Sequence, residues 1–349
     1  MPVTVVVGGQ YGSEGKGKVA LETARADLTT AFAVRPGGTN SGHTGFSRAG
    51  RRHVLRQLPA AGIDGGIGVI IPAGAYVDVD LLLREIEEIA LEPRKVHVDP
   101  RAHVITPAHA AWEREAGLTR TIGSTGSGTG AAVLARAARY AAGLPQGIPA
   151  GEHPRLRDFL TDTVAIMRDA LTRGRRIVVE GTQGFGLSPI HGDAWPKATS
   201  RDTTAAAFLA EAGLAPSDAD DITLVLRSHP IRVAGDSGPL RGETSWAEIA
   251  RLSGGPWSDG ELTSVTRRTR RVGTFDVGQA RRAVLVNQPH RIVLNHLDQV
   301  DNSVAESDSL TPQAEAFVRE VERGLGRRID QLGFGERRQV NRAAAAVHG

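Results

Sequence analysis

A glycine-rich run that directly follows a short apolar stretch constrains the fold of this chain most. Val3–Val7 has the composition of a buried strand, and the run Gly8-Gly9-Gln10-Tyr11-Gly12-Ser13-Glu14-Gly15-Lys16-Gly17-Lys18 follows it. Such a loop before a helix favours a phosphate site, because main-chain N–H groups can approach the anion and the helix start adds positive potential. The run fits a P-loop spacing, but Val19 stands where a magnesium-binding Ser or Thr is usual. A tight strand-to-helix connection without a ligand is the structural alternative.

Alternating apolar segments predict an α/β fold in a single large domain. Buried strands are expected at Val3–Val7, Gly68–Ile71, Lys95–Val98, Arg176–Glu180, Ile222–Arg227 and Arg291–Asn295. Helices are expected at Val79–Ala90, Ala131–Ala142, Leu156–Thr172 and Pro312–Leu325. This alternation predicts a central, mostly parallel sheet flanked by helices, with ligands beyond the carboxyl ends of the strands. We expect the domain to span residues 1–341, followed by a tail at 342–349.

The composition excludes several classes of function. The 349 residues are 40% hydrophobic and 23% charged, and the absence of cysteine rules out disulfides and thiolate metal sites. No apolar run is long enough to cross a bilayer and no signal-peptide pattern is present, so we expect a cytoplasmic protein without a membrane partner. The 42 basic against 39 acidic residues lack the bias of a general nucleic-acid binder, so no nucleic-acid partner is expected. Basic residues cluster at Arg267–Arg271, which favours small anions as ligands or a solvated face.

Five further segments carry residues suited to chemistry. They are Arg35–Thr44 with a histidine after glycine, the glycine- and hydroxyl-rich Ile122–Gly130, the strand end Val179–Gly184, Thr263–Asp276, and Leu294–Asp298. A histidine can act as a general acid, and a carboxylate at a strand end can accept two N–H bonds from a guanine edge. Each segment also has a structural interpretation: a structural histidine, a flexible glycine loop or an ordinary strand-to-turn cap.

Taken together, and in order from Val3 to about Asn341, these segments resemble the adenylosuccinate synthetase family. GSEGKGK resembles the family's GDEGKGK, GGTNSGHT its GGHNAGHT, and IGSTGSGTG its IGTTGRGIG. EGTQG resembles EGAQG, VTRRTRRVGTFD resembles TTGRRRRTGWLD, and NHLD resembles TKLD. The resemblance implies a P-loop NTPase-related α/β fold and a carbon–nitrogen ligase that joins L-aspartate to the 6-position of a purine nucleotide. It also implies Mg²⁺, a nucleoside triphosphate donor, and a homodimer.

The resemblance also implies which residues form the site. Catalytic roles fall to Ser13, Lys16, His43 as general acid, and Gln183. The purine nucleotide would contact Ser13, Asn40, Ser124, Thr125, Gln183 and Thr199, and Arg139 would reach the neighbouring active site of the dimer. Aspartate would be held by Thr266, Arg268 and Arg270, since guanidinium groups bind carboxylates bidentately. The triphosphate would contact Gly12, Glu14, Gly15, Lys16, Gly17, Gly42, His43, Thr44, Asn295, Asp298 and Gly335. The metal would lie by Ser13 and the Gly42 carbonyl.

Three departures from the family pattern bear on the substrates. Ser13 replaces the catalytic Asp, His296 replaces a Lys, and Glu336 replaces a Pro near the donor base. A serine is a far weaker base than a carboxylate, but it is smaller and can accept a hydrogen bond from a 2-amino group, which favours a guanine base. The phage N6-succino-2-amino-2′-deoxyadenylate synthase branch of the family carries Ser here, acts on dGMP and uses ATP or dATP.

Three functions therefore stay open at this stage. The first is a phage-type ligase acting on dGMP with ATP or dATP, which would work in the host cytoplasm. The second is an ordinary adenylosuccinate synthetase that acts on IMP with GTP. The third is a nucleotide-binding regulator that has lost catalysis, which only the change at Ser13 suggests.

Overall fold

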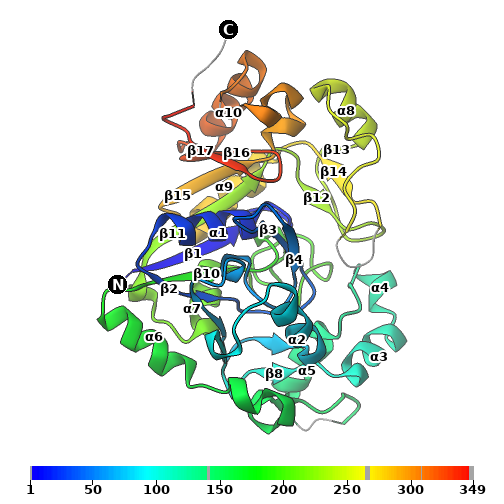
Figure 1. Ribbon diagram of the computed structural model, residues 1–349. Helices are drawn as coiled ribbons and strands as arrows, with labels where there is room; N and C mark the ends of the chain where they lie inside the picture. The colour runs from blue at the N-terminus through cyan, green and yellow to red at the C-terminus, as the bar shows by residue number, and fades with distance from the viewer. Residues whose placement is uncertain (1, 140–141, 264–267, 308, 346–349) are drawn as a thin grey trace.

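The computed structural model describes residues 2–139, 142–263, 268–307 and 309–345 (Figure 1). Its centre is a nine-stranded sheet in the order β17-β16-β15-β11-β1-β10-β2-β5-β7. All neighbouring strands are parallel except β17, which pairs antiparallel with β16. The predicted α/β fold with a large, mostly parallel sheet is thus confirmed, and the strand before the glycine run lies in its middle.

The elements have the following bounds. In chain order, the strands of the large sheet are β1 Val3–Gly8, β2 Thr30–Val34, β5 Gly68–Ile71, β7 Val96–Val98, β10 Arg176–Glu180, β11 Ala219–Arg227, β15 Arg291–Asn295, β16 Gln331–Phe334 and β17 Arg338–Asn341. Smaller sheets are formed by β3 His43–Phe46 and β4 Arg52–Leu55, by β6 Tyr76–Val77, β8 His103–Val104 and β9 Ile148–Pro149, and by β12 Ile231–Arg232, β13 Glu243–Thr244 and β14 Arg271–Gly273.

Ten α-helices are present among the described residues. They are α1 Lys16–Ala26, α2 Val79–Glu88, α3 Pro107–Glu115, α4 Leu118–Thr121, α5 Thr129–Ala138, α6 Thr163–Thr172, α7 Ala205–Ala212, α8 Trp246–Ser253, α9 Val277–Asn287 and α10 Pro312–Leu325. Across those same ranges, none of the helices combines the length and the apolar character that a membrane span requires.

Helices cover both faces of the sheet, as the alternation of side chains along β1 requires. Val3, Val5 and Val7 are fully buried in one cluster with residues of α6, α7 and α9. Val6 points to the opposite face and packs with Val19 of α1. Because both faces of β1 are apolar, the strand is continuously hydrophobic, and this made it easy to recognise in the sequence.

Most expected elements are confirmed with shifts of a few residues at their ends. β7 begins at Val96 rather than Lys95, β11 begins three residues early at Ala219, α2 ends at Glu88, and α5 spans Thr129–Ala138. Three strands of the large sheet were not predicted: Thr30–Val34, Gln331–Phe334 and Arg338–Asn341. Arg342, the first residue of the expected tail, donates a hydrogen bond to Glu315 of α10 at 2.7 Å.

The prediction of one helix over Leu156–Thr172 is wrong. A short 3-10 helix covers Pro154–Phe159, the chain then extends, and α6 begins at Thr163. The break occurs because the Asp162 side chain accepts the main-chain N–H of Ala165 at 3.1 Å and so caps the helix. The apolar spacing continues through the break, so periodicity alone could not place it.

We expect Asp162→Ala to lower the free energy of unfolding by about 1 kcal/mol, because the first turn of α6 loses its cap. Urea unfolding followed by circular dichroism measures this. The matched control is Asp158→Ala, which removes an exposed carboxylate from the preceding 3-10 helix and should change the free energy by less than about 0.5 kcal/mol. Equal effects of the two substitutions would contradict a capping role for Asp162.

Candidate active site

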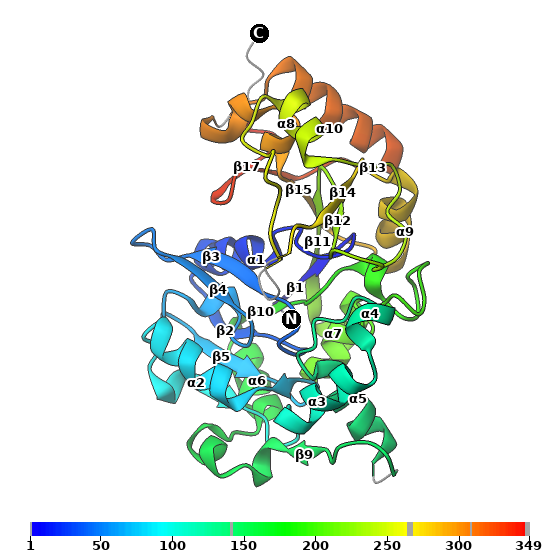
Figure 2. The same cartoon turned by 90° about the vertical axis from the view of Figure 1, so that its right-hand side faces the viewer.

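A cleft lies beyond the carboxyl ends of the central strands, with a volume of about 1410 Å³ that includes open solvent at its mouth. Segments that follow β1, β2, β10 and β11 line it, as expected for a parallel sheet. In Figure 2, α3, α4 and α5 lie on one side of this region and the small sheet β12-β14-β13 on the other. Of the predicted site residues, the cleft brings together Gly12, Ser13, Lys16, Asn40, Gly42, His43, Ser124, Thr125, Gln183, Thr199, Arg268 and Arg270.

The remaining predicted residues lie elsewhere. Arg139 is exposed at the end of α5 and does not line the cleft of its own chain. Thr266 lies outside the described residues. Glu14 is buried beneath the loop. Gly17 packs closely against His43 and Thr44. Gly15 lies against Asn295, and Asp298 and Gly335 form a second group with Lys18.

A buried carboxylate shapes the loop after β1. Glu14 Oε1 accepts the main-chain N–H groups of Gly12 at 2.8 Å and of Gln10 at 3.1 Å, and Oε2 accepts Lys16 Nζ at 2.6 Å. Gly15 lies at the N-cap, just before α1, with φ of 92°, and a Cβ there would lie 2.6 Å from Asn295 Nδ2, so this position requires glycine. The loop is therefore held from within and packed against the end of β15.

His43 is held by a carboxylate that the sequence analysis did not single out. His43 Nδ1 lies 2.6 Å from Glu180 Oε1 at the end of β10, and the same oxygen accepts Arg35 Nη1 at 3.0 Å. Burial, followed by the charges of Arg35 and Lys16, lowers the pKa of His43 to about 4, although the hydrogen bond to Glu180 opposes this shift. Nδ1 is committed to Glu180, so Nε2 is the nitrogen left for a ligand.

Ser13 contacts one of the predicted aspartate-binding arginines. Arg270 Nη1 donates to Ser13 Oγ at 2.5 Å, while Arg227 Nη1 donates to the Ser13 carbonyl at 3.0 Å. This contact joins the loop between β1 and α1 (residues 9–15, the reaction loop) to the segment that carries Arg268 and Arg270. Two cleft residues, Ser13 and Gln183, have positive φ values of 56° and 64°, which non-glycine residues rarely adopt and which cluster at functional sites.

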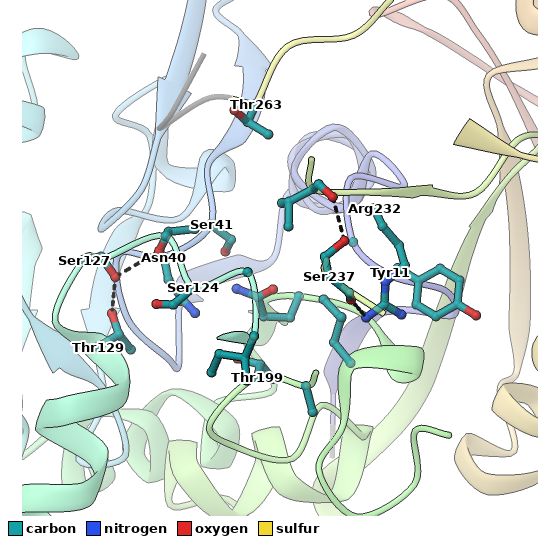
Figure 3. Close-up of a pocket in the computed structure, with 18 of the residues that line it drawn as sticks. Tyr11, Asn40, Ser41, Ser124, Ser127, Thr129, Thr199, Arg232, Ser237 and Thr263 are labelled. Carbon is teal, nitrogen blue, oxygen red and sulfur yellow. Dashed lines mark hydrogen bonds between the residues drawn. The ribbon is translucent and has the colours of Figure 1, made fainter. Parts of the chain in front are cut away.

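The opposite wall of the cleft is rich in hydroxyl groups (Figure 3). Glu113 accepts the main-chain N–H groups of Gly128 at 3.0 Å and Ala131 at 3.1 Å, which fixes the loop at the start of α5. Ser127 and Thr129 exchange a hydrogen bond at 3.0 Å beside this turn. Hydroxyl groups next to a helix start are suited to phosphate oxygens.

Another part of the cleft wall contains a buried cation. The Arg232 guanidinium lies 4.6 Å from the centre of the Tyr11 ring and donates to the Lys197 carbonyl at 2.9 Å (Figure 3). Burial lowers the pKa of Arg232 from its usual value. Val233 and Ser237, which line the same wall, follow it on the chain.

The second group lies around Lys18. Lys18 Nζ donates to the carbonyls of Gly335 at 3.3 Å and Arg338 at 3.2 Å, and burial lowers its pKa to about 8. Asp298 Oδ1 accepts the Gly335 N–H at 2.9 Å, and burial raises the pKa of Asp298. Arg337 reaches from this group to the β3–β4 hairpin, donating to the Gly50 carbonyl at 3.0 Å. A cavity bounded by Lys18, Phe46 and Glu336 separates the two hairpins.

Sequence reasoning missed four charged residues that support the site. Glu180 stands in the strand-end segment and Lys18 in the glycine run, but neither received a role. The fully buried Arg227 forms an ion pair with the half-buried Glu261. A charge that follows an uninterrupted apolar strand, as at Glu180 and Arg227, is the signal that could have identified two of them.

The His43 ring should be neutral at neutral pH in the free protein and should gain a proton when a polyanion binds. The low pKa follows from burial and two nearby cations, and an anion opposite Nε2 would stabilise the charged ring. NMR titration of isotope-labelled histidine, without and with inorganic pyrophosphate, measures both states, and His43→Asn assigns the signal. Glu180→Gln should lower the pKa further. A ring already protonated at neutral pH in the free protein would contradict this prediction.

Comparisons with known proteins agree with this site. The sequence model of the adenylosuccinate synthetase family matches residues 5–145 and 150–306. Adenylosuccinate synthetases of Pyrococcus sp. (strain ST700) and Thermococcus onnurineus (strain NA1) are each 36% identical over 332 residues, which cover 93% of this chain and 94% of the relative. The family resemblance seen in the sequence is therefore confirmed.

Two solved structures resemble the whole chain. Fully ligated adenylosuccinate synthetase from Plasmodium falciparum superposes with a TM-score of 0.84 at 19% identity, over 98% of this chain and 100% of that one, and supports the fold. Succinoaminodeoxyadenylate synthetase of cyanophage S-2L, bound to dGMP and to dATP as an energy donor, superposes with a TM-score of 0.80 at 28% identity, over 97% of this chain and 95% of that one. The chain belongs to the adenylosuccinate synthetase family, carbon–nitrogen ligases that join aspartate to a purine nucleotide.

Proposed function

We propose that this chain joins L-aspartate to the 6-position of dGMP with hydrolysis of ATP or dATP. The product is N6-succino-2-amino-2′-deoxyadenylate, a precursor of 2-aminoadenine in DNA. The observation that carries the proposal is the serine at position 13, in the reaction loop of an otherwise complete family motif. The likeness to the phage S-2L enzyme, which was solved with dGMP and dATP, supports it.

The surroundings of Ser13 support a base with a 2-amino group. Its hydroxyl accepts one hydrogen bond from Arg270, which leaves a second lone pair for an N–H of the substrate. A carboxylate here would be larger and would pair with the Arg270 guanidinium, so it would both crowd the C2 substituent and occupy the arginine. The serine avoids both effects.

Two departures on the donor side support ATP or dATP over GTP. His296 is half-buried with φ of 63°, and desolvation lowers its pKa well below the usual value, so it supplies no positive charge. Glu336 adds a carboxylate at the edge of the Lys18 cavity.

The other ligands are assigned to the residues implied by the family motifs. Arg268, Arg270 and Thr266 hold aspartate, and His43 is the general acid towards the leaving diphosphate. Lys16 contacts the reacting oxygen and Gln183 the purine. The hydroxyl-rich wall holds the nucleotide through Asn40, Ser124, Thr125 and Thr199. Arg139 from a second copy of the chain contacts the phosphate of that nucleotide. The exposed position of Arg139, outside its own cleft, supports this homodimer.

Magnesium fits this site as part of the metal–triphosphate complex. Among the described residues no group of three or more His, Cys, Asp or Glu side chains is placed to hold a metal ion. Ser13 Oγ already accepts from Arg270, and the Glu14 carboxylate is used by Lys16 and the loop. Mg²⁺ commonly takes most of its ligands from substrate phosphates and water, so the Gly42 carbonyl would complete its shell, while the lone pairs of the Ser13 hydroxyl serve Arg270 and the substrate. Bound there, the ion would neutralise charge on the phosphates.

An ordinary adenylosuccinate synthetase acting on IMP with GTP is the second candidate. The archaeal relatives of that name, at 36% identity over nearly their whole length, favour it. A regulator without catalysis is the third, and the cluster of His43, Lys16 and Gln183 in one cleft with Arg268 and Arg270 argues against it.

Substrate use separates these functions. Aspartate-dependent phosphate release should be fastest with dGMP and ATP or dATP, and weak with IMP and GTP. GMP in place of dGMP reports the preference for deoxyribose. Rapid turnover of IMP with none of dGMP would refute the proposal, and no turnover of any nucleotide, with retained binding, would support the regulator.

Two substitutions at Ser13 separate the effect of size from that of charge. Ser13→Asp should shift the preference from dGMP towards IMP, because the carboxylate supplies an N1 base, commonly worth about 10²–10⁴-fold in rate, and crowds the 2-amino group. Ser13→Asn has the same size without the charge, and both residues tolerate a positive φ. Asn should therefore lose dGMP without gaining IMP. If Ser13→Asn kept full dGMP activity, crowding would not be the reason for the preference.

A further inference from the structure

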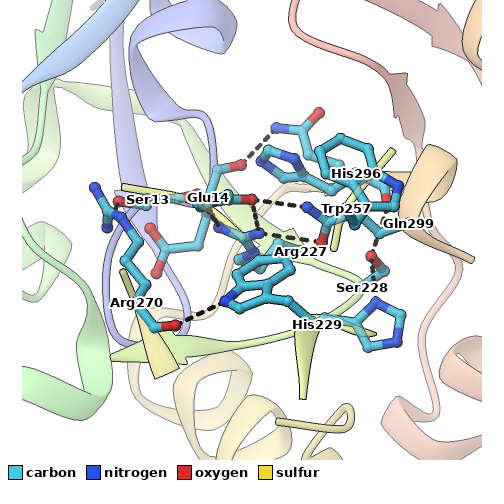
Figure 4. Close-up of polar contacts among 12 residues, drawn as sticks. Ser13, Glu14, Arg227, Ser228, His229, Trp257, Arg270, His296 and Gln299 are labelled. Carbon is cyan, nitrogen blue, oxygen red and sulfur yellow. Dashed lines mark hydrogen bonds and ion pairs between the residues drawn. The ribbon is translucent and has the colours of Figure 1, made fainter. Parts of the chain in front are cut away.

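One buried guanidinium joins three segments around the cleft (Figure 4). Arg227, the last residue of β11, is fully buried. Its Nη1 donates to the Ser13 carbonyl at 3.0 Å and to Glu261 Oε2 at 3.1 Å. Its Nη2 donates to Glu261 Oε1 at 2.5 Å and to Gln299 Oε1 at 3.1 Å. The reaction loop, the segment before the arginines and the segment after β15 thus share one side chain.

The main chain of Arg227 is fixed as firmly as its side chain. Gln10, in the loop after β1, accepts the Arg227 N–H at 2.9 Å through Oε1 and donates to the Arg227 carbonyl at 3.1 Å through Nε2. On the other side, Gln299 Nε2 donates to Glu261 Oε1 at 2.7 Å. The guanidinium therefore cannot shift without breaking hydrogen bonds in buried surroundings.

Glu261 connects Arg227 to Arg270, because its side chain pairs with Arg227 and its main chain binds Arg270. The Arg270 N–H donates to the Glu261 carbonyl at 2.8 Å, and the Arg270 carbonyl accepts Trp246 Nε1 at 2.7 Å. With its main chain held at both ends, Arg270 directs its guanidinium to Ser13 Oγ. Arg227 therefore fixes both ends of the Ser13–Arg270 contact: the carbonyl of one residue and, through Glu261, the backbone of the other.

Both partners of the Arg227–Glu261 ion pair carry their charge. Burial alone would raise the pKa of Glu261, but the adjacent Arg227 guanidinium lowers it far below the usual value. Only a planar fork can reach the two carboxylate oxygens, the Ser13 carbonyl and Gln299 together, because a lysine has a single nitrogen. The contact set is thus specific for arginine.

We propose that Arg227 is a positioning residue for the use of aspartate, because it holds Ser13 and, through Glu261, Arg270 in the arrangement that receives the amino acid. It makes no contact with the cleft itself, since it is absent from the cleft lining. The proposal rests on the assignment of aspartate to Arg270 made above, but it does not depend on which purine is the substrate. A purely structural role would affect stability alone.

The test is the aspartate dependence of Arg227→Met and Arg227→Lys, measured with dGMP and with IMP. The KM for aspartate should rise by about tenfold or more in the Met variant, while the KM for the purine nucleotide changes far less. A tenfold change is of the size usual when one site affects ligand binding at another. Lysine keeps the charge and should restore part of the loss. Calorimetric titration of aspartate into the protein–nucleotide complex gives the same comparison without turnover.

Arg168→Met is the matched control. Arg168 forms a bidentate ion pair with the buried Asp218 in another part of the fold, and its Nη1 lies 2.8 Å from Asp218 Oδ1. Neither residue lines the cleft. This variant should lower the melting temperature and leave the aspartate KM unchanged. If Arg227→Met behaved in the same way, or raised the nucleotide KM equally, the positioning role would be overturned.

Glu261→Gln keeps the question answerable if Arg227→Met does not fold. It preserves the shape of the side chain and removes its charge, and it should raise the aspartate KM or Kd in the same direction; an unchanged value would overturn the proposal. Preference for IMP over dGMP would refute the proposed substrate. It would leave this comparison intact, because the KM and Kd for aspartate can be measured with either nucleotide.

Discussion

The carboxylate of Glu14 determines the course of the chain between β1 and α1. It satisfies two main-chain N–H groups of the loop and the Lys16 ammonium at once, in full burial. Without it, two donors and a cation would remain unpaired inside the protein, a loss of several kcal/mol by the usual magnitude for buried groups. Ser13 and Lys16 flank this anchor in sequence, so it fixes the positions of both of these cleft residues. The rest of the site is arranged around a loop that is hydrogen-bonded from within by its own buried carboxylate.

The large sheet and the motif residues could be predicted from sequence, whereas the supporting charges could not. Strands such as β1 are uninterrupted apolar runs, and the motifs fall at their carboxyl ends because parallel strands deliver them to one edge. The short strand Thr30–Val34 contains a half-buried Phe32 and lacks such a run, so it was missed. His43 and Glu180 are 137 residues apart, and Ser13 and Arg227 are 214 apart. Pairings over such distances depend on the finished fold and leave no local pattern.

The two ends of the site are connected by the hairpin that carries His43. β3 starts at His43, and the hairpin extends to Gly50, where Arg337 of the β16–β17 turn donates to the main chain. Arg337 also lies 4.3 Å from the centre of the Phe46 ring. A donor nucleotide that places its phosphates at His43 and its base beside Lys18 would lie along this hairpin. In such a complex, contacts to the base would be linked through the hairpin to the orientation of His43, the proposed general acid.

The positive φ of Ser13 also bears on how such enzymes diversify. A loop that holds one residue in the left-handed region is compatible with a small set of side chains, chiefly Gly, Asn and Asp, with Ser accepted at some strain. Within that set, size and charge can change while the main chain stays where Glu14 and Arg227 hold it. Under the proposed function, a change of nucleobase preference therefore requires substitution at a single codon and no remodelling of the loop.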